Sequence, residues 1–218
     1  MRLQLIKILV IFLLSFNYMW AQIQVEELGR FGGTGSKHGQ FKNPSAIDVN
    51  DAGNVFVCDR GNNRIQVFDQ TGFFIKDIGG FGSQNDQFDE PMDVWARNTL
   101  NIFVADYNNH RIQRFDRELN FISAFYSNEG NDERFQYEEV LSVAHSAQGD
   151  LFILEAGENK VIKFQRETAQ TSFGYFDSGI GELIEPVQID LTPDENVLVS
   201  DLGNKCINVY DYFGNFIK

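Results

Sequence analysis

Histidines and carboxylates are the side chains in this sequence that could hold a metal or move a proton. There are three histidines, His38, His110 and His145, and 31 Asp and Glu residues. A zinc site needs several such ligands about 2 Å from one ion. Two carboxylates could also act as a general acid and a general base, but nothing in the sequence singles out such a pair.

Motifs that would bring a specific chemistry are also missing. The sequence has no Asp-x-Asp-x-Asn-Gly calcium loop, no Gly-x-Ser-x-Gly nucleophile turn and no phosphate-binding glycine loop. The segment Gly29 to Gly35 is rich in glycine, but no helix follows it, and a phosphate loop needs a helix N-terminus. We therefore predict no catalytic residue, no metal ligand and no cofactor.

The elements that position these side chains follow from an internal repeat. Four copies of a short apolar run end in an acidic residue, and these residues are 47, 49 and 46 positions apart by subtraction: Asp59, Asp106, Glu155 and Asp201. A β-rich run follows each, and an aromatic residue or Leu with a Pro three positions later precedes three of them. In the third copy the equivalent pair is read as Phe135 and Glu138.

This period and these short strands predict an all-β fold, a β-propeller of four-stranded antiparallel blades. In the first copy we expect strands at Ala46 to Val49, Val55 to Cys58, Arg64 to Phe68 and Gly72 to Lys76. The predicted domains are a signal peptide at 1–21 and a propeller at 22–218, with repeats at about 30–77, 78–125, 126–175 and 176–218. Neighbouring blades must share their apolar faces, because one blade alone cannot bury them.

The turn between the second and third strands resembles that of the NHL repeat family of TolB-like, six-bladed propellers. The segment Asn109-His110-Arg111 falls on the Asn-His-Leu that names the family. Polar side chains of this kind cap backbone N–H groups in tight turns, so we interpret the repeat-turn residues as structural: Asp59, Asn62, Arg64, Asp106, Asn109, Arg111, Asp201 and Asn204. The third copy departs from the pattern with Glu155, Glu158 and Lys160, and the fourth with Cys206.

The resemblance implies six blades, whereas four repeats are present. Strand accounting favours a partial propeller that lacks about two blades, with a compact four-bladed ring or an open arc that pairs with a partner as alternatives. Lys218 aligns with Lys76, at the end of a fourth outer strand.

Recognition is expected in the loops that join the blades, because these differ most between copies. The candidate rim residues are Lys37, His38, Asn43, Asp86, Asp89, Glu90, Glu133 and Glu185. Trp95 is a candidate for the central channel, on the strand position where we align Asp48, Ser142 and Asp190. It either stacks on a sugar or peptide or fills the channel by packing.

Connectivity places His38 in a blade-joining loop and His145 beyond an innermost strand, on opposite faces of a propeller. The zinc-binding, peptide-amidating lyases also resemble NHL propellers, but this separation argues against a similar histidine site here. A metal-dependent hydrolase or lyase with ligands in further blades, and a sensor domain of a larger signalling protein, stay as alternatives.

The first residues predict export. Arg2 and Lys7 precede the apolar run Ile8 to Leu14, and Ala21 ends the segment, as in a secretory signal peptide too short to span a membrane. The formal charge is −13, and removing two basic residues and no acid makes it −15. This charge argues against a nucleic-acid or membrane partner.

Cys58 and Cys206 align with different strands of the repeat, so we expect two separate thiols rather than a disulfide. Together these features predict a secreted or periplasmic scaffold that binds a protein, peptide or glycan.

Overall fold

A computed structural model describes residues 29–98, 100–127, 132–176 and 178–218. The chain divides into two units, residues 1–30 and residues 31–218. The second unit contains all the strands found among the described residues. The expected signal peptide at 1–21 lies outside the described residues. No helix among the described residues is long and apolar enough to cross a membrane.

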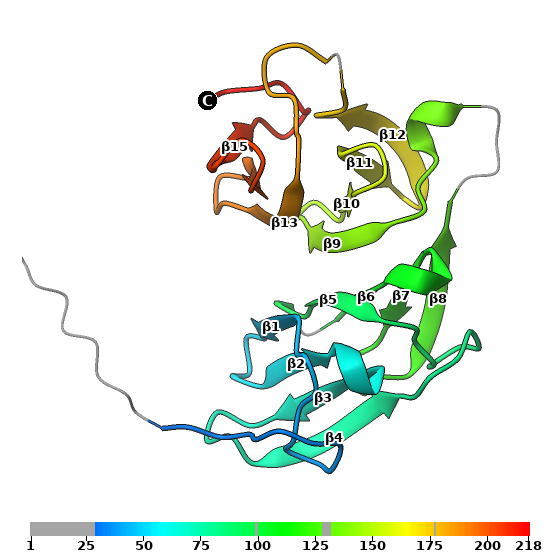
Figure 1. Cartoon of the computed structure of the whole chain (residues 1–218), viewed down its shortest axis with the longest axis vertical. Helices are drawn as coiled ribbons and strands as arrows, with labels where there is room; N and C mark the ends of the chain where they lie inside the picture. Colours follow the sequence, from blue (N-terminus) through cyan, green and yellow to red (C-terminus); the bar gives the residue numbers. More distant parts are fainter. Residues whose placement is uncertain (1–28, 99, 128–131, 177) are drawn as a thin grey trace, which may run out of the picture. The chain divides into compact units, whose positions relative to one another are not determined.

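Residues 31–218 form the four-bladed β-propeller array that the repeat predicts (Figure 1). The first blade contains β1 (Ala46–Val49), β2 (Val55–Asp59), β3 (Arg64–Phe68) and β4 (Phe74–Gly79). The second contains β5 (Pro91–Trp95), β6 (Ile102–Asp106), β7 (Arg111–Phe115) and β8 (Phe121–Tyr126). Each is an antiparallel meander in chain order.

The third and fourth blades repeat the plan. The third contains β9 (Val140–His145), β10 (Leu151–Glu155), β11 (Lys160–Gln165) and β12 (Thr168–Phe173). The fourth contains three named strands, β13 (Pro186–Leu191), β14 (Val197–Asp201) and β15 (Cys206–Tyr210). Phe216 bridges Tyr210, and the Val209 N–H donates to the Lys218 carbonyl at 2.8 Å, so residues 216–218 lie at the position of the outer strand.

Short 3-10 turns follow the second strand of the first two blades, and a third precedes β9: η2 (Arg60–Asn62), η3 (Tyr107–Asn109) and η4 (Glu133–Phe135). Asn63 and His110 end η2 and η3 with φ of 54° each. Asn, Asp and His tolerate this left-handed conformation better than most residues, which explains their place at these turns.

The outermost strand of the first blade begins later than predicted, at Phe74 rather than Gly72. Gly72 belongs instead to a turn in which its N–H donates to the Asp69 carbonyl at 2.9 Å. Its φ of 83° is left-handed, which suits glycine and a turn rather than a strand.

The hydrophobic core lies between the blades. Three clusters join the first blade to the second, the second to the third and the third to the fourth. Ile65, Val104 and Ile153 are fully buried in these junctions. Each buried side chain of this size contributes about 1.5 to 3 kcal/mol, so stability resides in the contacts between neighbouring blades.

The alignment of the third copy needs a correction of two residues. Trp95 pairs with Phe103 on the next strand, and Ala144 pairs with Phe152. Ala144, not Ser142, is thus the equivalent of Trp95. The aromatic that precedes this strand is likewise Tyr137, followed by Val140, rather than Phe135 and Glu138. The two extra residues of the 49-residue spacing therefore lie in the loop before β9.

The end blades each leave one face uncovered in the described part of the chain. Ile47 pairs with Val57 as Val94 pairs with Val104 and Ile189 with Val199. Ile47 is 63% exposed, while Ile189 is 3% exposed at the same repeat position. On the other end face Ile207 is 60% exposed, although its equivalents Ile65, Ile112 and Val161 are fully buried.

Polar contacts near the innermost strands link successive blades, and one of them joins the second blade directly to the fourth. The buried Asp93 carboxylate of β5 accepts from the Ser142 hydroxyl of β9 at 2.5 Å, and the same hydroxyl accepts from the Ile189 N–H of β13 at 3.2 Å. Arg97, just after β5, forms a bidentate pair with Asp190 of β13 and lies 3.4 Å from Asp48 of β1. Burial raises the pKa of Asp93 above its ordinary value, although three donors oppose this shift.

Candidate binding rim

The rim consists of the loops before each innermost strand together with the turns between the second and third strands. One carboxylate in each repeat joins these two segments. The backbone N–H groups of Lys42, Asp89 and Glu185 donate to Asp59, Asp106 and Asp201, at 2.7, 2.8 and 3.0 Å. The repeat aspartates thus hold each of these loops against the turn of its own blade.

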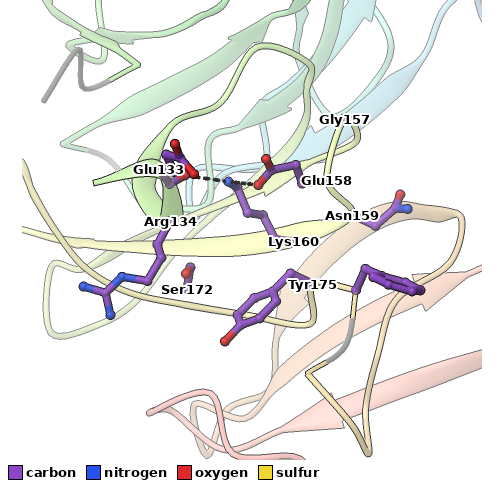
Figure 2. A pocket seen from close by; sticks show the side chains of 9 residues that line it. Glu133, Arg134, Gly157, Glu158, Asn159, Lys160, Ser172 and Tyr175 are labelled. Carbon is purple, nitrogen blue, oxygen red and sulfur yellow. Dashed lines mark hydrogen bonds and ion pairs between the residues drawn. The ribbon is translucent and has the colours of Figure 1, made fainter. Parts of the chain in front are cut away.

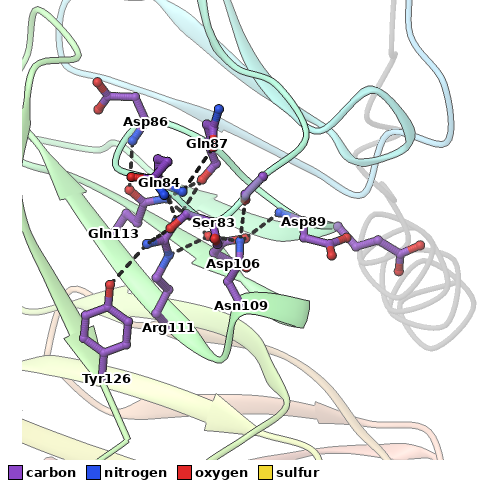
Figure 3. A network of polar contacts seen from close by, with 12 residues as sticks. Ser83, Gln84, Asp86, Gln87, Asp89, Asp106, Asn109, Arg111, Gln113 and Tyr126 are labelled. Atoms are coloured by element: carbon purple, nitrogen blue, oxygen red, sulfur yellow. Dashed lines mark hydrogen bonds and ion pairs between the residues drawn. The ribbon is translucent and has the colours of Figure 1, made fainter.

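The second repeat shows the complete network (Figure 3). The buried Arg111 side chain donates through Nε to Asp106 and through its amino groups to the Tyr126 hydroxyl and three backbone carbonyls, those of Ser83, Gln84 and Gln87. A guanidinium has five N–H donors, and these contacts use as many. Asn109 donates to the carbonyl of Gly82 at 2.9 Å.

The first repeat reproduces this arrangement with Arg64, which donates to Asp59, Asp77 and the carbonyls of Lys37 and Gln40. Asn62 donates to the carbonyl of Gly35 at 2.9 Å. The fourth repeat keeps the amide contact alone, with Asn204 donating to the Glu182 carbonyl at 2.8 Å and to Asp201. Cys206 replaces the arginine there.

The third repeat departs from the pattern and leaves a pocket (Figure 2). Glu155 replaces the aspartate and caps the Gly157 and Glu158 N–H groups at 2.8 Å. Lys160 replaces the arginine, and its buried ammonium contacts the Glu133 carbonyl at 3.3 Å and the Glu158 carboxylate at 2.5 Å. Two of its three donors are thus used.

The pocket has a volume of about 450 Å³, within the range of ligand sites. Its polar wall comes from the third-repeat turn and from Glu133 and Arg134 of η4. Its other wall contains Ser172, Tyr175 and Phe176. The two aromatic residues are 40% and 80% exposed. The pocket therefore combines an ammonium, carboxylates and accessible aromatic rings on the rim.

The first-repeat rim residues Lys37, His38 and Asn43 are exposed. The His38 ring stacks on Phe74 at 4.3 Å between centroids, and its Nε2 lies 3.7 Å from the Asp77 carboxylate. Asn43 has a left-handed φ of 47°. These contacts hold the loop against the outer strand of its own blade.

The acidic rim residues of the second repeat differ in exposure and in their contacts. Asp86 is exposed, and Asp89 and Glu90 are half-buried. The Glu90 carboxylate accepts from Arg60 of the preceding blade at 2.6 Å, and its N–H donates to Asn63. Glu90 thus ties two neighbouring blades together at the rim.

The last two rim candidates, Glu133 and Glu185, are both exposed. Glu133 lines the third-repeat pocket, whereas Glu185 contacts Asp201 through its backbone. The structure therefore brings one of the predicted rim carboxylates to a pocket and spreads the others along the loops.

Trp95 lies in the packing between the second and third blades and is 8% exposed. Its ring contacts Phe103 and His145, with centroids 6.0 and 5.0 Å away. His110 Nδ1 lies 2.6 Å from the Glu138 carbonyl. The described residues contain no group of three or more His, Cys, Asp or Glu side chains placed to hold a metal.

The two thiols lie apart. Cys58 is fully buried and its Sγ donates to the Pro91 carbonyl at 3.0 Å, while Cys206 is exposed; both are free. Burial raises the pKa of the Cys58 thiol far above its ordinary value. A thiol that stays protonated is a poor nucleophile, so Cys58 serves packing rather than chemistry.

Sequence reasoning did not single out Lys160, Tyr175 or Phe176 as site residues. The departure of the third repeat from the Asp, Asn and Arg pattern was the available signal, because a shorter cation at an arginine position leaves space. The aromatic wall carries no repeat signal and required the structure.

Comparison with known families bears on the turns just described. The family described as NHL repeat matches residues 41–68 and 96–115. These segments include the two complete carboxylate–arginine turns. The chain carries NHL repeats.

Curated relatives match over one short stretch. The B-box type zinc finger protein ncl-1 of Caenorhabditis elegans is 49% identical over 45 residues, which is 21% of this chain and 5% of that protein. The human E3 ubiquitin-protein ligase TRIM32 is 47% identical over 51 residues, 23% of this chain and 8% of that protein. The matched stretch is thus a small part of these longer proteins.

Solved structures match across most of the NHL-repeat chain. A streptogramin B lyase superposes with a TM-score of 0.58 at 15% identity, covering 80% of this chain and 53% of that one. A protein of unknown function from Bacteroides caccae gives 0.57 at 12% identity, covering 83% and 62%. At these identities the likeness shows the propeller fold alone. The chain spans little more than half the length of these structures.

Proposed function

We propose that this NHL-repeat β-propeller is an exported, noncatalytic scaffold that binds a protein or peptide through its rim. The observation that carries the proposal is the contrast between the second and third repeats. Arg111 uses all its donors within the rim, whereas the third repeat has the shorter Lys160 and a pocket of about 450 Å³. A partner side chain can enter that pocket while its backbone contacts the loops.

The chemistry of the pocket favours a peptide group over a glycan or nucleic acid. The positive charges of Arg134 and Lys160 in the lining are paired with Asp132 and Glu158. Glu133 adds a further carboxylate, and Tyr175 and Phe176 offer ring faces. A cationic side chain stacks on such rings and pairs with such carboxylates. The proposed partner therefore presents a lysine or arginine flanked by uncharged residues.

A peptide library displayed on phage and selected on the purified chain tests this proposal. Selected peptides should contain a basic residue and lose at least about tenfold in affinity on Lys160→Arg, because the longer guanidinium fills the pocket, and on Tyr175→Ala. Lys37→Ala, on the first-repeat rim, is the matched control and should change affinity little. If the selected peptides bound both third-repeat variants with unchanged affinity, the proposed site would be contradicted.

Export rests on the first 21 residues and has its own test. Expression of the full chain in a secreting host, followed by mass analysis of the N-terminus, should show removal of residues 1–21. Intracellular retention with an intact N-terminus would overturn this part. Metal analysis of the same preparation addresses the enzymatic alternative, because a tightly held stoichiometric zinc or calcium would count against a noncatalytic scaffold.

A further inference from the structure

A second pocket, of about 390 Å³, lies between the second and third blades at the ends of the strands opposite the rim. Its floor is apolar and its mouth is polar. The floor contains Phe103, Phe125, Leu151 and Phe164, and the mouth contains Asn101, Arg114, His145, Arg166 and Glu167. None of these residues belongs to the rim or to the repeat turns.

Two of the polar residues occupy positions where the first and fourth repeats have apolar side chains. Pairing places Arg114 opposite Phe103, as Val67 lies opposite Phe56 and Val209 opposite Leu198. The third repeat has Lys163 at this position, opposite Phe152. His145 occupies the position of Val49, Ala96 and Leu191. A framework that accepts an apolar residue at these sites does not need a cation or an imidazole there, so the repeat alone does not explain Arg114 and His145.

Arg114 is held in place with its amino groups facing few partners. Its Nε donates to the Asn101 side chain at 2.9 Å, and its guanidinium carbon lies 6.0 Å from the centre of the Phe103 ring. The nearest carboxylate, Glu167, is 3.8 Å from Nη1, which is an ion pair without a hydrogen bond. The two amino groups can thus donate hydrogen bonds to both oxygens of a ligand carboxylate.

His145 offers a polar atom with no partner. Its Nδ1 is buried and makes no hydrogen bond with the described residues. The ring stacks on Phe103 with centroids 5.0 Å apart. Burial, helped by Arg114, lowers the pKa of His145 below its ordinary value. A buried polar atom without a partner destabilises a protein unless something satisfies it.

The turn at the mouth is strained where the other repeats are relaxed. Arg166 and Glu167 have φ of 48° and 66°, as a tight two-residue hairpin requires, but such turns favour Asn and Gly. The other three blades use a longer turn capped by an aspartate: Asp69, Asp116 and Asp211. The Arg166 side chain makes no hydrogen bond or ion pair with any described residue. Strain that brings a free cation to a pocket mouth is a mark of a functional site.

From this geometry we propose that the pocket binds a small organic carboxylate with an aromatic body. The phenylalanine floor receives the ring, and the Arg114 guanidinium pairs with the carboxylate, whose oxygen can also accept from His145 in its Nδ1-protonated form. Arg166 adds a second positive charge against the single carboxylate of Glu167. This net positive mouth stands out in a chain whose formal charge is −13.

Phenylacetate serves as the probe, and phenylacetamide, which has the same shape without the charge, is the control compound. Isothermal titration of the purified chain should give saturable phenylacetate binding at least about tenfold tighter than binding of phenylacetamide. Arg114→Val should abolish that preference, and the repeat accepts valine at this position. Arg166→Gln, an exposed change that leaves the packing intact, should weaken phenylacetate binding several-fold.

Arg117→Gln is the matched control, because Arg117 is exposed and pairs with Glu118 outside the pocket; it should leave phenylacetate binding unchanged. Equal binding of the two compounds, or no saturable binding of phenylacetate at millimolar concentrations, would overturn the proposal. The proposal would also be overturned if Arg166→Gln and a folded Arg114→Val variant both bound phenylacetate with unchanged affinity. Because none of these residues lies on the rim, failure here leaves the peptide-binding proposal standing.

Discussion

The same side chain at equivalent positions of two blades provides a direct test of the packing argument. Ile189 is 3% exposed between the third and fourth blades, and Ile47 is 63% exposed on the free face of the first. Truncating a buried Ile to Ala costs about 2 to 5 kcal/mol. Scaled by the covered fraction, we expect a loss of about 3 kcal/mol for Ile189→Ala and about 1 kcal/mol or less for Ile47→Ala.

Urea unfolding measures both variants against the unsubstituted chain. Trp95 lies between the second and third blades, so its fluorescence reports that junction, while far-ultraviolet circular dichroism reports all blades. Arrays of repeats can unfold in steps, and coincidence of the two signals tells whether one free energy describes the transition. Ile189→Ala should lower the midpoint clearly and Ile47→Ala only slightly.

Ile112 and Ile207 repeat the comparison on the opposite blade faces, since Ile112 is fully buried and Ile207 is 60% exposed. Equal losses within either pair would refute the reasoning. Such a result would mean that the face described as uncovered is packed in the native protein.

Three further predictions concern the core, the rim and the innermost strands. Phe88→Ala should cost about 3 to 5 kcal/mol in the same urea assay, because Phe88 is fully buried, whereas Phe81→Ala, at a 74% exposed residue, should cost little. Arg111→Lys should cost about 2 to 3 kcal/mol, because lysine cannot reach the carbonyls that the guanidinium satisfies; an unchanged midpoint would contradict the network in Figure 3. The raised pKa of Asp93 means that the folded state holds its proton more tightly than the unfolded state, so this group's stabilising contribution is present below about pH 4 and is lost as the pH rises through the folded-state pKa. The stability of Asp93→Asn relative to the unsubstituted chain should therefore increase from pH 4 towards neutrality, and a constant difference would contradict the assignment.

The blades were readable from the sequence because their determinants are local and repeated. Runs such as Ile102 to Asp106 consist of consecutive apolar, mostly strand-forming residues and end in a turn carboxylate. Each strand pairs with its neighbour in sequence. The alignment of the third repeat was wrong by two residues at Ser142 and Phe135. The spacing of 49 between the repeat carboxylates shows that two residues are inserted, but no residue type marks where in the loop they lie.

The pockets were harder to predict. The rim loops were correctly located as loops, but a pocket depends on which side chains fail to fill space, as with Lys160 in the place of an arginine. The second pocket depends on Arg114, His145 and Arg166, which are 52 residues apart from first to last by subtraction and meet only when two blades pack. Neither their spacing in the sequence nor the composition predicts that these three side chains lie close together.

The polar relay from Asp93 through Ser142 to Ile189 has a consequence for how the array unfolds. A repeat protein whose units contact only adjacent units can fray from its ends without disturbing distant units. Here one hydroxyl connects the second, third and fourth blades, and Arg97 connects the second directly to the fourth. Loss of the fourth blade by proteolysis would thus weaken the second blade as well as the third, so second-neighbour coupling widens the cooperative unit.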